Sequence, residues 1–265
     1  MATIYSEAVL AQETKIVDAG GNVDGGPVYY IRKAFKGGFG KFLAGFFAIA
    51  SMLALGFMGS MVQSNSIGET FNTAFGIPSW TVGIVVALLS GFIFIGGAQR
   101  IASVAEKIVP IMALLYIVGG LVVLAANIKN IPESFALIFK SAFDPGAVFG
   151  GAAGMTIKAA ISQGAKRGLF SNEAGMGSTP HAHALADVKK VEKPHDQGVA
   201  AMIGVFIDTF VVLTMTALVV ISTLYVGDNA VLASGAAEGV SKTNMAQLAF
   251  GSVFGDKVGS IFVAI

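Results

Sequence analysis

Long runs without charged residues recur along the chain, and five of them predict helical membrane spans. The spans lie near Phe39–Val62, Trp80–Gly97, Ile108–Ala126, Gly198–Tyr225 and Met245–Ile265. A bilayer core of ~30 Å requires about 20 apolar residues in a helix. Buried helices of soluble proteins rarely recur at this length in so short a chain, and the strands of a membrane barrel would alternate in polarity. The pattern therefore predicts an all-α transmembrane protein.

A glycine-rich segment, Pro145–Ala186, is a different kind of apolar region. It has the length of a span, but charged residues and Pro180 interrupt it, together with Gly150, Gly151, Gly154, Gly164, Gly168, Gly175 and Gly177. Non-helical backbone at membrane depth is tolerated only where it is buried in protein or lines a cavity, and an interrupted span is typical of a transporter's binding site. We predict one broken span here, and about six spans in total.

The distribution of basic residues agrees with this count. If the first loop is cytoplasmic, ten basic residues lie in cytoplasmic loops and three in outer loops. The cytoplasmic set is Lys15, Arg32, Lys33, Lys36, Lys41, Arg100, Lys107, Lys189, Lys190 and Lys193, and the outer set is Lys129, Lys140 and Lys242. Cytoplasmic loops carry an excess of Lys and Arg, so this alternation is the expected one if Pro145–Ala186 crosses the membrane once.

Composition supports a membrane environment and excludes several functions. Of 265 residues, 54% are hydrophobic and 12% are charged, about half the charged share of a soluble domain. The net charge of +1 offers no basic face for nucleic acid. Cysteine is absent, which excludes disulfides and thiolate chemistry. Met1–Gln12 contains no basic start before a long apolar core, so no cleavable signal peptide is visible.

Glycines at four-residue spacing predict close packing of helices. Gly251, Gly255 and Gly259 form two successive GxxxG steps, and Gly150 with Gly154 forms another. Such steps let two helix backbones approach each other, but they are generic in membrane helices and indicate nothing about function.

Polar side chains within the apolar regions mark candidate binding residues. An acid at the middle of a bilayer costs ~2.5–3.5 kcal/mol on insertion scales, so it usually has a task or a partner. Glu7, Glu173 and Asp208 are such acids, although Glu7 could also lie at the end of a span. Gln63 and Asn65 offer donors and acceptors, which suits either a zwitterionic ligand or hydrogen bonds between helices.

The densest polar set in the broken span is Ser171-Asn172-Glu173, within the sequence GLFSNEAGMGSTP at 168–180. If the helix unwinds there, its backbone exposes free N–H and C=O groups. The following half-helix would direct its positive N-terminal end toward a substrate carboxylate, and freed carbonyls would face an ammonium group or Na⁺. No catalytic chemistry requires this arrangement, so we predict a transporter and not an enzyme.

The whole chain resembles the alanine or glycine:cation symporter family, also called the sodium:alanine symporters. The signature is GLFSNEAGMGSTPHAHA at 168–184, in which His181 stands where an apolar residue is more usual. Further matches follow in order: YSEAVLA at 5–11, GGPVYYI at 25–31, MVQSNSI at 61–67, VAEKIVP at 104–110 and VFIDT at 205–209. Hydrophobicity alone does not produce these short polar motifs in this order.

The resemblance implies a fold and an activity. Members are bacterial and archaeal inner-membrane proteins that import alanine, glycine and similar small neutral amino acids with Na⁺ by alternating access. Their fold is similar to the leucine-transporter type, with two inverted five-helix repeats. On that alignment, residues 1–265 are expected to form a single transmembrane domain truncated at both ends, from the end of helix 2 to within helix 8. Na⁺ is the coupling ion, and no cofactor is implied.

The resemblance also implies which residues bind substrate. Residues matching the unwound sixth helix are Phe170, Ser171, Asn172, Glu173 and Gly175. Gln63 matches a glutamine of the third helix, and Asn65 is a second candidate nearby. Two roles stay open: Phe170 either packs or contacts substrate, and Glu173 either accepts freed N–H groups or contacts an ammonium group.

Asp208 and Thr209 are candidates for a sodium site, because they fall on the seventh helix and that helix contributes to such a site in related folds. Other ion-binding motifs fail. His181 and His183 are two residues apart, so on a helix they point to nearly opposite faces and do not form a metal pair. GGFGK at 37–41 is not a phosphate loop, because Phe42 stands where Ser or Thr is required.

Two other classes of function fit less well. A channel would need a continuous polar lining through several spans, whereas the polar groups here gather near two levels. A membrane enzyme would need a base, a nucleophile or a metal set, and the sequence assembles none. The expected partners are therefore a small neutral amino acid, Na⁺ and the lipid bilayer, with no nucleic acid.

Overall fold

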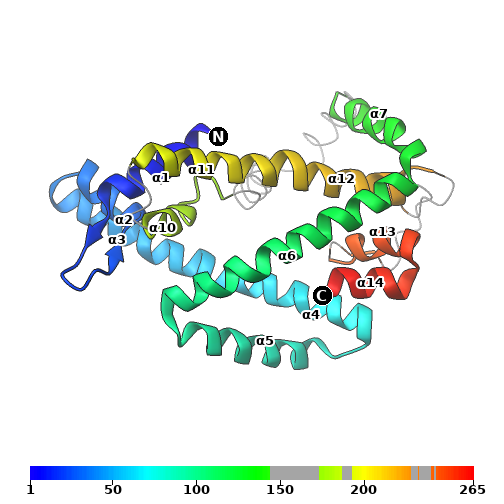
Figure 1. Cartoon of the computed structure of the whole chain (residues 1–265), viewed down its shortest axis with the longest axis horizontal. Coiled ribbons are helices and arrows are strands. Elements are labelled where there is room, and N and C mark those ends of the chain that lie inside the picture. The colour runs from blue at the N-terminus through cyan, green and yellow to red at the C-terminus, as the bar shows by residue number, and fades with distance from the viewer. Residues whose placement is uncertain (144–172, 187–192, 228–231, 233–239, 242) are drawn as a thin grey trace, which may run out of the picture. The chain divides into compact units, whose positions relative to one another are not determined.

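Helices make up most of the chain (Figure 1). The computed structural model describes residues 1–143, 173–186, 193–227, 232, 240–241 and 243–265. The α-helices are α1 (Ala2–Thr14), α2 (Pro27–Ala34), α3 (Gly37–Ser51), α4 (Ser60–Phe75), α5 (Ser79–Phe94), α6 (Gly97–Ala126), α7 (Ile131–Ala142), α10 (Thr179–Ala184), α11 (Pro194–Phe206), α12 (Thr214–Val220), α13 (Met245–Phe254) and α14 (Asp256–Ala264). Three π-helices and a 3₁₀ turn complete them: η1 (Met52–Gly59), η3 (Ile207–Leu213), η4 (Ile221–Tyr225) and η2 (Ile128–Asn130).

Short strands interrupt the helices once in the described chain. β1 (Ile16–Val17) pairs antiparallel with β2 (Val23–Asp24) between α1 and α2. The apolar pattern did not predict this hairpin, because each strand has only two residues and both strands are largely exposed.

Three helices of the described chain are long and apolar enough to cross a membrane: Gly37–Phe75, Gly97–Ala126 and Pro194–Tyr225. The helices α5 and α13 are apolar but shorter. Large apolar side chains such as Phe57, Leu114 and Phe210 are exposed on the long helices, which suits surfaces that face lipid or further helices. The helices are therefore those of an all-α transmembrane protein, whereas the count of about six spans stays a prediction.

Two helices extend beyond the predicted spans. The sequence predicted a loop before Ile108–Ala126, whereas α6 runs without interruption from Gly97 through Pro110. The span predicted at Phe39–Val62 continues as a helix to Phe75. Hydropathy marks only the part of a helix that lies in the apolar core, so it does not detect polar turns that continue the helix.

The prediction of one span at Met245–Ile265 is wrong. The chain forms two short helices, α13 and α14, which pack on each other and are separated at Gly255, where φ is +86°. The GxxxG glycines therefore do not line one helix. Two of them still permit close contact, because a Cβ on Gly259 would lie 2.3 Å from the backbone nitrogen of Gly251.

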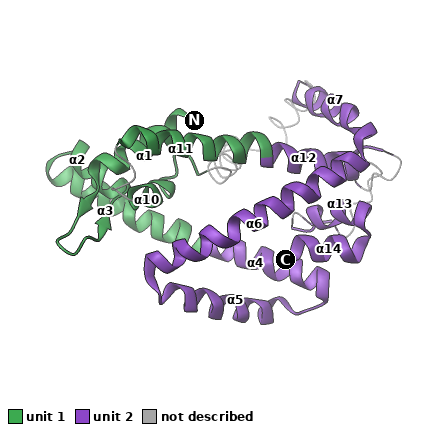
Figure 2. Ribbon diagram, in the orientation of Figure 1, with its two compact units in different colours: residues 1–59, 148–211 green, residues 60–147, 212–265 purple. Residues whose placement is uncertain are grey.

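The described residues divide into two compact units (Figure 2). Unit 1 comprises residues 1–59 and 148–211, and unit 2 comprises residues 60–147 and 212–265. Each unit is built from two separate stretches of the chain. The prediction of a single domain over residues 1–265 is not tested by this division and stays a prediction.

The core of unit 1 lies between α1 and α11. Ile4 and Ala8 of α1 are buried against Ala201 and Val205 of α11. The helices come close at Gly198 because a glycine leaves room for the neighbouring ring: a Cβ there would lie 2.6 Å from Cδ2 of Tyr5.

We expect Gly198→Ala to destabilise unit 1. The added methyl group would overlap the Tyr5 ring, and overpacking of this kind costs ~1–3 kcal/mol. Gly204→Ala is the matched control, because it lies on the same helix and its Cβ position has no atom of the described residues within 4 Å. Thermal unfolding of the complete protein in detergent should show a lower midpoint for Gly198→Ala only. Equal midpoints for the two variants would contradict the packing described here.

The core of unit 2 joins α6, α12, α13 and α14. Val123 of α6, Met215 of α12 and Phe250 of α13 are buried together. Phe250 also stacks on Phe262 of α14, with ring centroids 5.2 Å apart. Gly119 of α6 lies against the same ring, since a Cβ there would be 2.6 Å from Phe262. Gly119 is not part of a GxxxG step, because its partner is an aromatic ring and not a second glycine.

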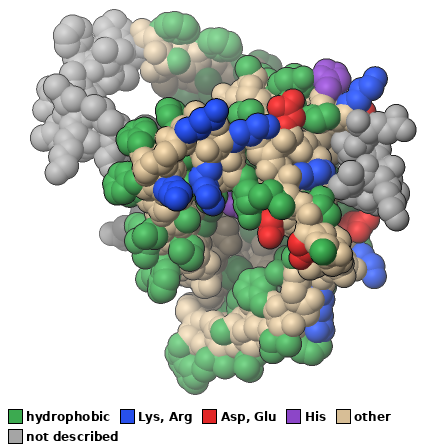
Figure 3. Space-filling view, turned by 90° about the vertical axis from the view of Figure 1, so that its left-hand side faces the viewer, with side chains coloured by type: hydrophobic (Ala, Val, Ile, Leu, Met, Phe, Trp, Pro, Cys, Tyr) green, Lys and Arg blue, Asp and Glu red, His purple; other side chains and the backbone are tan. Residues whose placement is uncertain are grey.

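Basic side chains gather on unit 1 around α2 and the start of α3. Arg32, Lys36 and Lys41 line a shallow pocket of about 190 Å³. Figure 3, viewed from the side on which these helices lie, shows Lys and Arg side chains close together. All three residues belong to the loop predicted to be cytoplasmic, where an excess of positive charge is expected.

Candidate functional site

The segment 173–178 leaves helical geometry at three positions. Glu173, Gly175 and Gly177 have φ values of +58°, +91° and +83°, all in the left-handed region. A turn hydrogen bond of 3.0 Å runs from the N–H of Met176 to the carbonyl oxygen of Glu173. The segment is thus non-helical, as predicted for this part of the broken span, and glycine is the residue that reaches such φ values without strain.

Glu7 of α1 binds this segment. Its Oε2 accepts a hydrogen bond of 3.1 Å from the backbone N–H of Gly175. Tyr30 of α2 lies nearby: burial, together with the negative charge of Glu7, raises the pKa of Tyr30 to about 12. Sequence reasoning noted Glu7 as an acid in an apolar region but did not place it in the site. The contact spans 168 residues of sequence, so no local pattern could have revealed it.

Glu173 binds the start of the next helix. Its Oε2 accepts hydrogen bonds from the hydroxyls of Ser178, at 2.5 Å, and Thr179, at 3.4 Å. The sequence left two roles open for Glu173: accepting freed backbone N–H groups, or contacting an ammonium group. These hydrogen bonds resemble the first role, with hydroxyl groups as the donors instead of backbone N–H groups. The helix that follows, α10, has only six residues, Thr179–Ala184.

Hydrogen bonds join α1, α10 and α11 to one another next to residues 173–178. The hydroxyl of Tyr5 lies 2.7 Å from Nδ1 of His195. Gln12 donates to the carbonyl oxygen of His183, and Nε2 of Gln197 lies 2.6 Å from Nδ1 of the same histidine. These bonds connect the three helices to one another, and the bond from Gly175 to Glu7 attaches the segment 173–178 to α1.

We expect Glu7→Ala to release the glycine-rich segment, because hydrogen bonds to charged groups contribute ~1.5–3 kcal/mol. The chain contains no cysteine, so Met176→Cys creates a single label site here. Maleimide labelling of Met176→Cys should become several-fold faster when Glu7→Ala is added. Glu13→Ala, on the last turn of the same helix, serves as the control and should leave the rate unchanged. An unchanged rate with Glu7→Ala would show that this contact does not hold the segment.

The two sodium candidates lie on η3, in the part of that helix assigned to unit 1. Asp208 is partly buried, and its Oδ2 is a buried oxygen with no hydrogen-bond partner among the described residues. A π-helical turn in a long helix frequently marks a functional site. Thr209 follows directly on the same turn.

Gln63 and Asn65 lie on α4 of unit 2, and both are exposed. The amide of Asn65 donates a hydrogen bond of 3.0 Å to Oε1 of Glu69, one turn further along the helix. Glu173 and Gly175 belong to unit 1, so a joint role of these four residues at one substrate stays a prediction. Phe170, Ser171 and Asn172 lie outside the described residues.

Apolar helices of membrane length and a polar, glycine-broken segment held by a carboxylate together define the class of a multi-pass helical membrane protein. The match to known sequences is specific: the profile of the sodium:alanine symporter family covers residues 1–265. The chain belongs to the sodium:alanine symporter family.

Three relatives illustrate the range of the family. The chain is 43% identical over 220 residues to the sodium/alanine symporter AgcS of Methanococcus maripaludis, covering 83% of this chain and 47% of that protein. It is 41% identical over 221 residues to the amino-acid carrier protein AlsT of Bacillus subtilis, covering 83% and 45%. It is 40% identical over 220 residues to the "Probable sodium/glutamine symporter GlnT" of Bacillus subtilis, covering 83% and 44%. The chain spans about half the length of the curated relatives it matches.

Proposed function

We propose that this chain forms part of a secondary transporter that moves small neutral amino acids, alanine and glycine first, together with Na⁺. The observation that carries the proposal is the non-helical segment 173–178, held against α1 by the bond from Gly175 to Glu7. Such a segment offers backbone groups to a zwitterion at membrane depth. Membership of a symporter family supports the same reading, and the names of AgcS and GlnT make alanine and glutamine the substrates to compare.

In the proposed site, donors and acceptors divide between the two ends of the substrate. Backbone N–H groups of the broken segment would bind the substrate carboxylate, and carboxylates or carbonyls would bind its ammonium group. The proposed substrate residues remain those predicted from the sequence: Gln63, Asn65, Phe170, Ser171, Asn172, Glu173 and Gly175. Glu7 joins them as the residue that positions Gly175.

Asp208 and Thr209 are proposed as ligands of the coupling Na⁺. Carboxylate and hydroxyl oxygens are the ligands that hard cations prefer, and the buried Oδ2 of Asp208 lacks a partner among the residues described. Each Na⁺ that moves inward gains ~2.3 kcal/mol per 100 mV of membrane potential, which can drive accumulation of the amino acid. The proposed transporter needs no further cofactor.

The architecture proposed for the complete protein is the leucine-transporter type, with about six of its spans in this chain and a location in the cell inner membrane. Alternating access would then occur by rocking of one helix bundle against the other around a fixed site. The alternation of basic residues between predicted cytoplasmic and outer loops supports the orientation.

Counterflow separates this carrier from a channel. Proteoliposomes containing the complete protein and excess unlabelled alanine, with Na⁺ equal on both sides, should transiently accumulate external labelled alanine. A channel would only equilibrate the label, which would contradict the proposal. Replacing alanine by glutamine in parallel liposomes identifies which of the two side-chain sizes the site accepts.

A further inference from the structure

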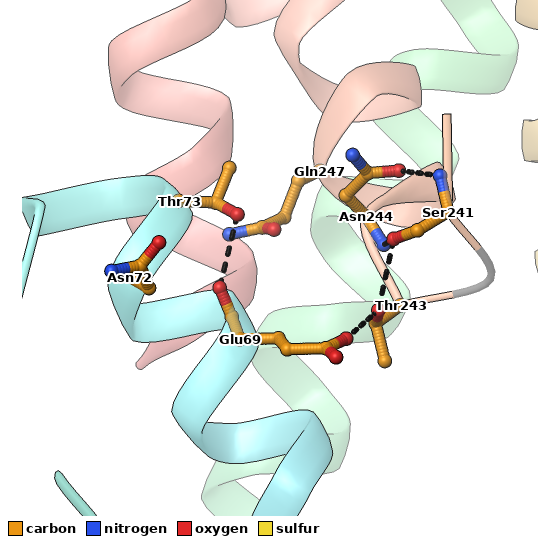
Figure 4. Close-up of a pocket in the computed structure, with 7 residues that line it drawn as sticks. All are labelled: Glu69, Asn72, Thr73, Ser241, Thr243, Asn244 and Gln247. Atoms are coloured by element: carbon orange, nitrogen blue, oxygen red, sulfur yellow. Dashed lines mark hydrogen bonds between the residues drawn. The ribbon is translucent and has the colours of Figure 1, made fainter. Parts of the chain in front are cut away.

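A polar pocket lies within unit 2 (Figure 4). It has a volume of about 300 Å³ and lies between the C-terminal half of α4 and the start of α13. Its lining consists of one carboxylate, three amides and three hydroxyls: Glu69, Asn72, Thr73, Ser241, Thr243, Asn244 and Gln247. None of these lining residues is among the proposed substrate or sodium ligands.

The carboxylate of Glu69 is held in place by neutral donors. Asn65 donates to its Oε1 at 3.0 Å, and the hydroxyl of Thr243 donates to its Oε2. No Lys or Arg of the described chain forms an ion pair with it. Each oxygen keeps a further lone pair, so the carboxylate can still accept a hydrogen bond from a cation.

Gln247 is a second polar residue of the lining, and it is buried beside the cavity. Its side chain is 1% exposed, and its Nε2 donates to the carbonyl oxygens of Thr70 and Ser260 at 3.0 and 3.1 Å. Because both partners are acceptors, the orientation of the amide is fixed, and Oε1 is the end that needs a donor. That oxygen is buried and has no partner within the described ranges. Buried polar atoms of this kind usually have a hydrogen-bond partner.

The position of the pocket on α4 also favours a positive charge. The lining residues Glu69, Asn72 and Thr73 lie in the last two turns of the helix, which ends at Phe75. The C-terminal end of a helix carries a partial negative charge that stabilises cations. The cavity thus has a carboxylate and a helix C-terminus on its α4 side, which favour a cation, and the N-terminal end of α13 on the other side, which favours an anion.

We propose that this pocket binds the ammonium group of a free small amino acid, as a second site whose lining residues all belong to unit 2. The ammonium group would donate to Glu69, and the surrounding amides and hydroxyls would accommodate the carboxylate. A volume of about 300 Å³ lies at the lower end of ligand pockets and suits a molecule of this size better than a bare ion. In the predicted topology, residues 69–79 and Lys242 are outside, so the pocket would receive amino acid at the outer face.

The choice of ligand rests on the proposed function, but the test does not require transport. Labelled alanine is the probe, and its equilibrium binding is measured on the purified complete protein carrying Asn172→Ala, which disables the proposed substrate site of the broken span. Glu69→Gln should lower the remaining affinity about two- to fivefold, because the ammonium group loses the one carboxylate of the lining and exposed ion pairs are weak. Glu69→Asp, which keeps the charge, should restore part of the binding. Glu106→Gln, an acid of α6 outside the pocket lining, is the matched control.

The outcomes separate the pocket from the transporter. Weaker alanine binding with Glu69→Gln, together with unchanged binding with Glu106→Gln, supports the second site even in a protein that fails to transport. Alanine binding that does not change with Glu69→Gln overturns it. Binding of ²²Na⁺ that depends on Glu69, with no alanine bound, also overturns it and identifies the pocket as an ion site. Size-exclusion chromatography of each variant establishes that it is folded before binding is measured.

Discussion

Gly175→Ala should reduce Na⁺-driven alanine uptake by the complete protein about tenfold or more. The φ of Gly175 is +91°, and a non-glycine residue held in such a conformation costs ~1–3 kcal/mol. Space is not the obstacle, because among the described residues a Cβ there would meet only Thr3, at 3.6 Å. The variant therefore tests the backbone conformation itself. Initial uptake rates in proteoliposomes at equal protein density measure the effect.

Two companion variants separate backbone strain from other causes. Gly175→Asn should keep more uptake than Gly175→Ala, since asparagine enters the left-handed region more readily than alanine. Gly45→Ala lies in the regular helix α3 with open space at its Cβ position and should leave uptake unchanged. If Gly175→Ala transports as well as Gly45→Ala, the left-handed backbone at this position is not needed for transport.

Asp208→Asn should raise the Na⁺ concentration required for half-maximal uptake by about thirtyfold or more. The bound Na⁺ would lose a charged ligand, and a loss of ~2 kcal/mol corresponds to about thirtyfold, since each 1.4 kcal/mol is a factor of ten in affinity. The substitution keeps the size of the side chain and removes only its charge. Uptake measured over a series of Na⁺ concentrations, with ionic strength held constant by choline chloride, gives the shift.

Asp196→Asn is the control for that measurement. Asp196 lies in the first turn of α11, at the start of the same long helix, and it is not a proposed ligand. It should retain the native dependence on Na⁺. Identical Na⁺ curves for Asp208→Asn and Asp196→Asn would remove Asp208 from the sodium site.

The sequence predicted the helical class because hydropathy is a local property. Apolar runs such as 108–126 must be helical in lipid, where every backbone polar group needs an internal partner. The ends of the helices were harder to predict, because Arg100 and Lys107 are polar and yet continue α6 beyond its apolar part. The break at Gly255 was missed for a related reason: glycine is compatible both with a helix-packing step and with the left-handed turn that ends α13.

The candidate site could also be predicted only in part from the sequence. The unwinding near Glu173 followed from the density of glycines in one short segment. The partners of that segment did not, since Glu7 meets Gly175 across 168 residues of sequence. The pocket at Glu69 could not be predicted either, because Thr243 and Gln247 reach α4 from a distant part of the sequence. Local patterns indicate which residues are unusual, whereas tertiary contacts decide which of them meet.

The most direct test of the central claim is uptake of labelled alanine by proteoliposomes containing the complete protein, under an inward Na⁺ gradient. We expect accumulation above the external concentration, collapse of that accumulation when choline replaces Na⁺, and strong loss in Gly175→Ala. The same small uptake with and without Na⁺, by a correctly folded protein that also rejects glycine and glutamine, would contradict the proposed symport.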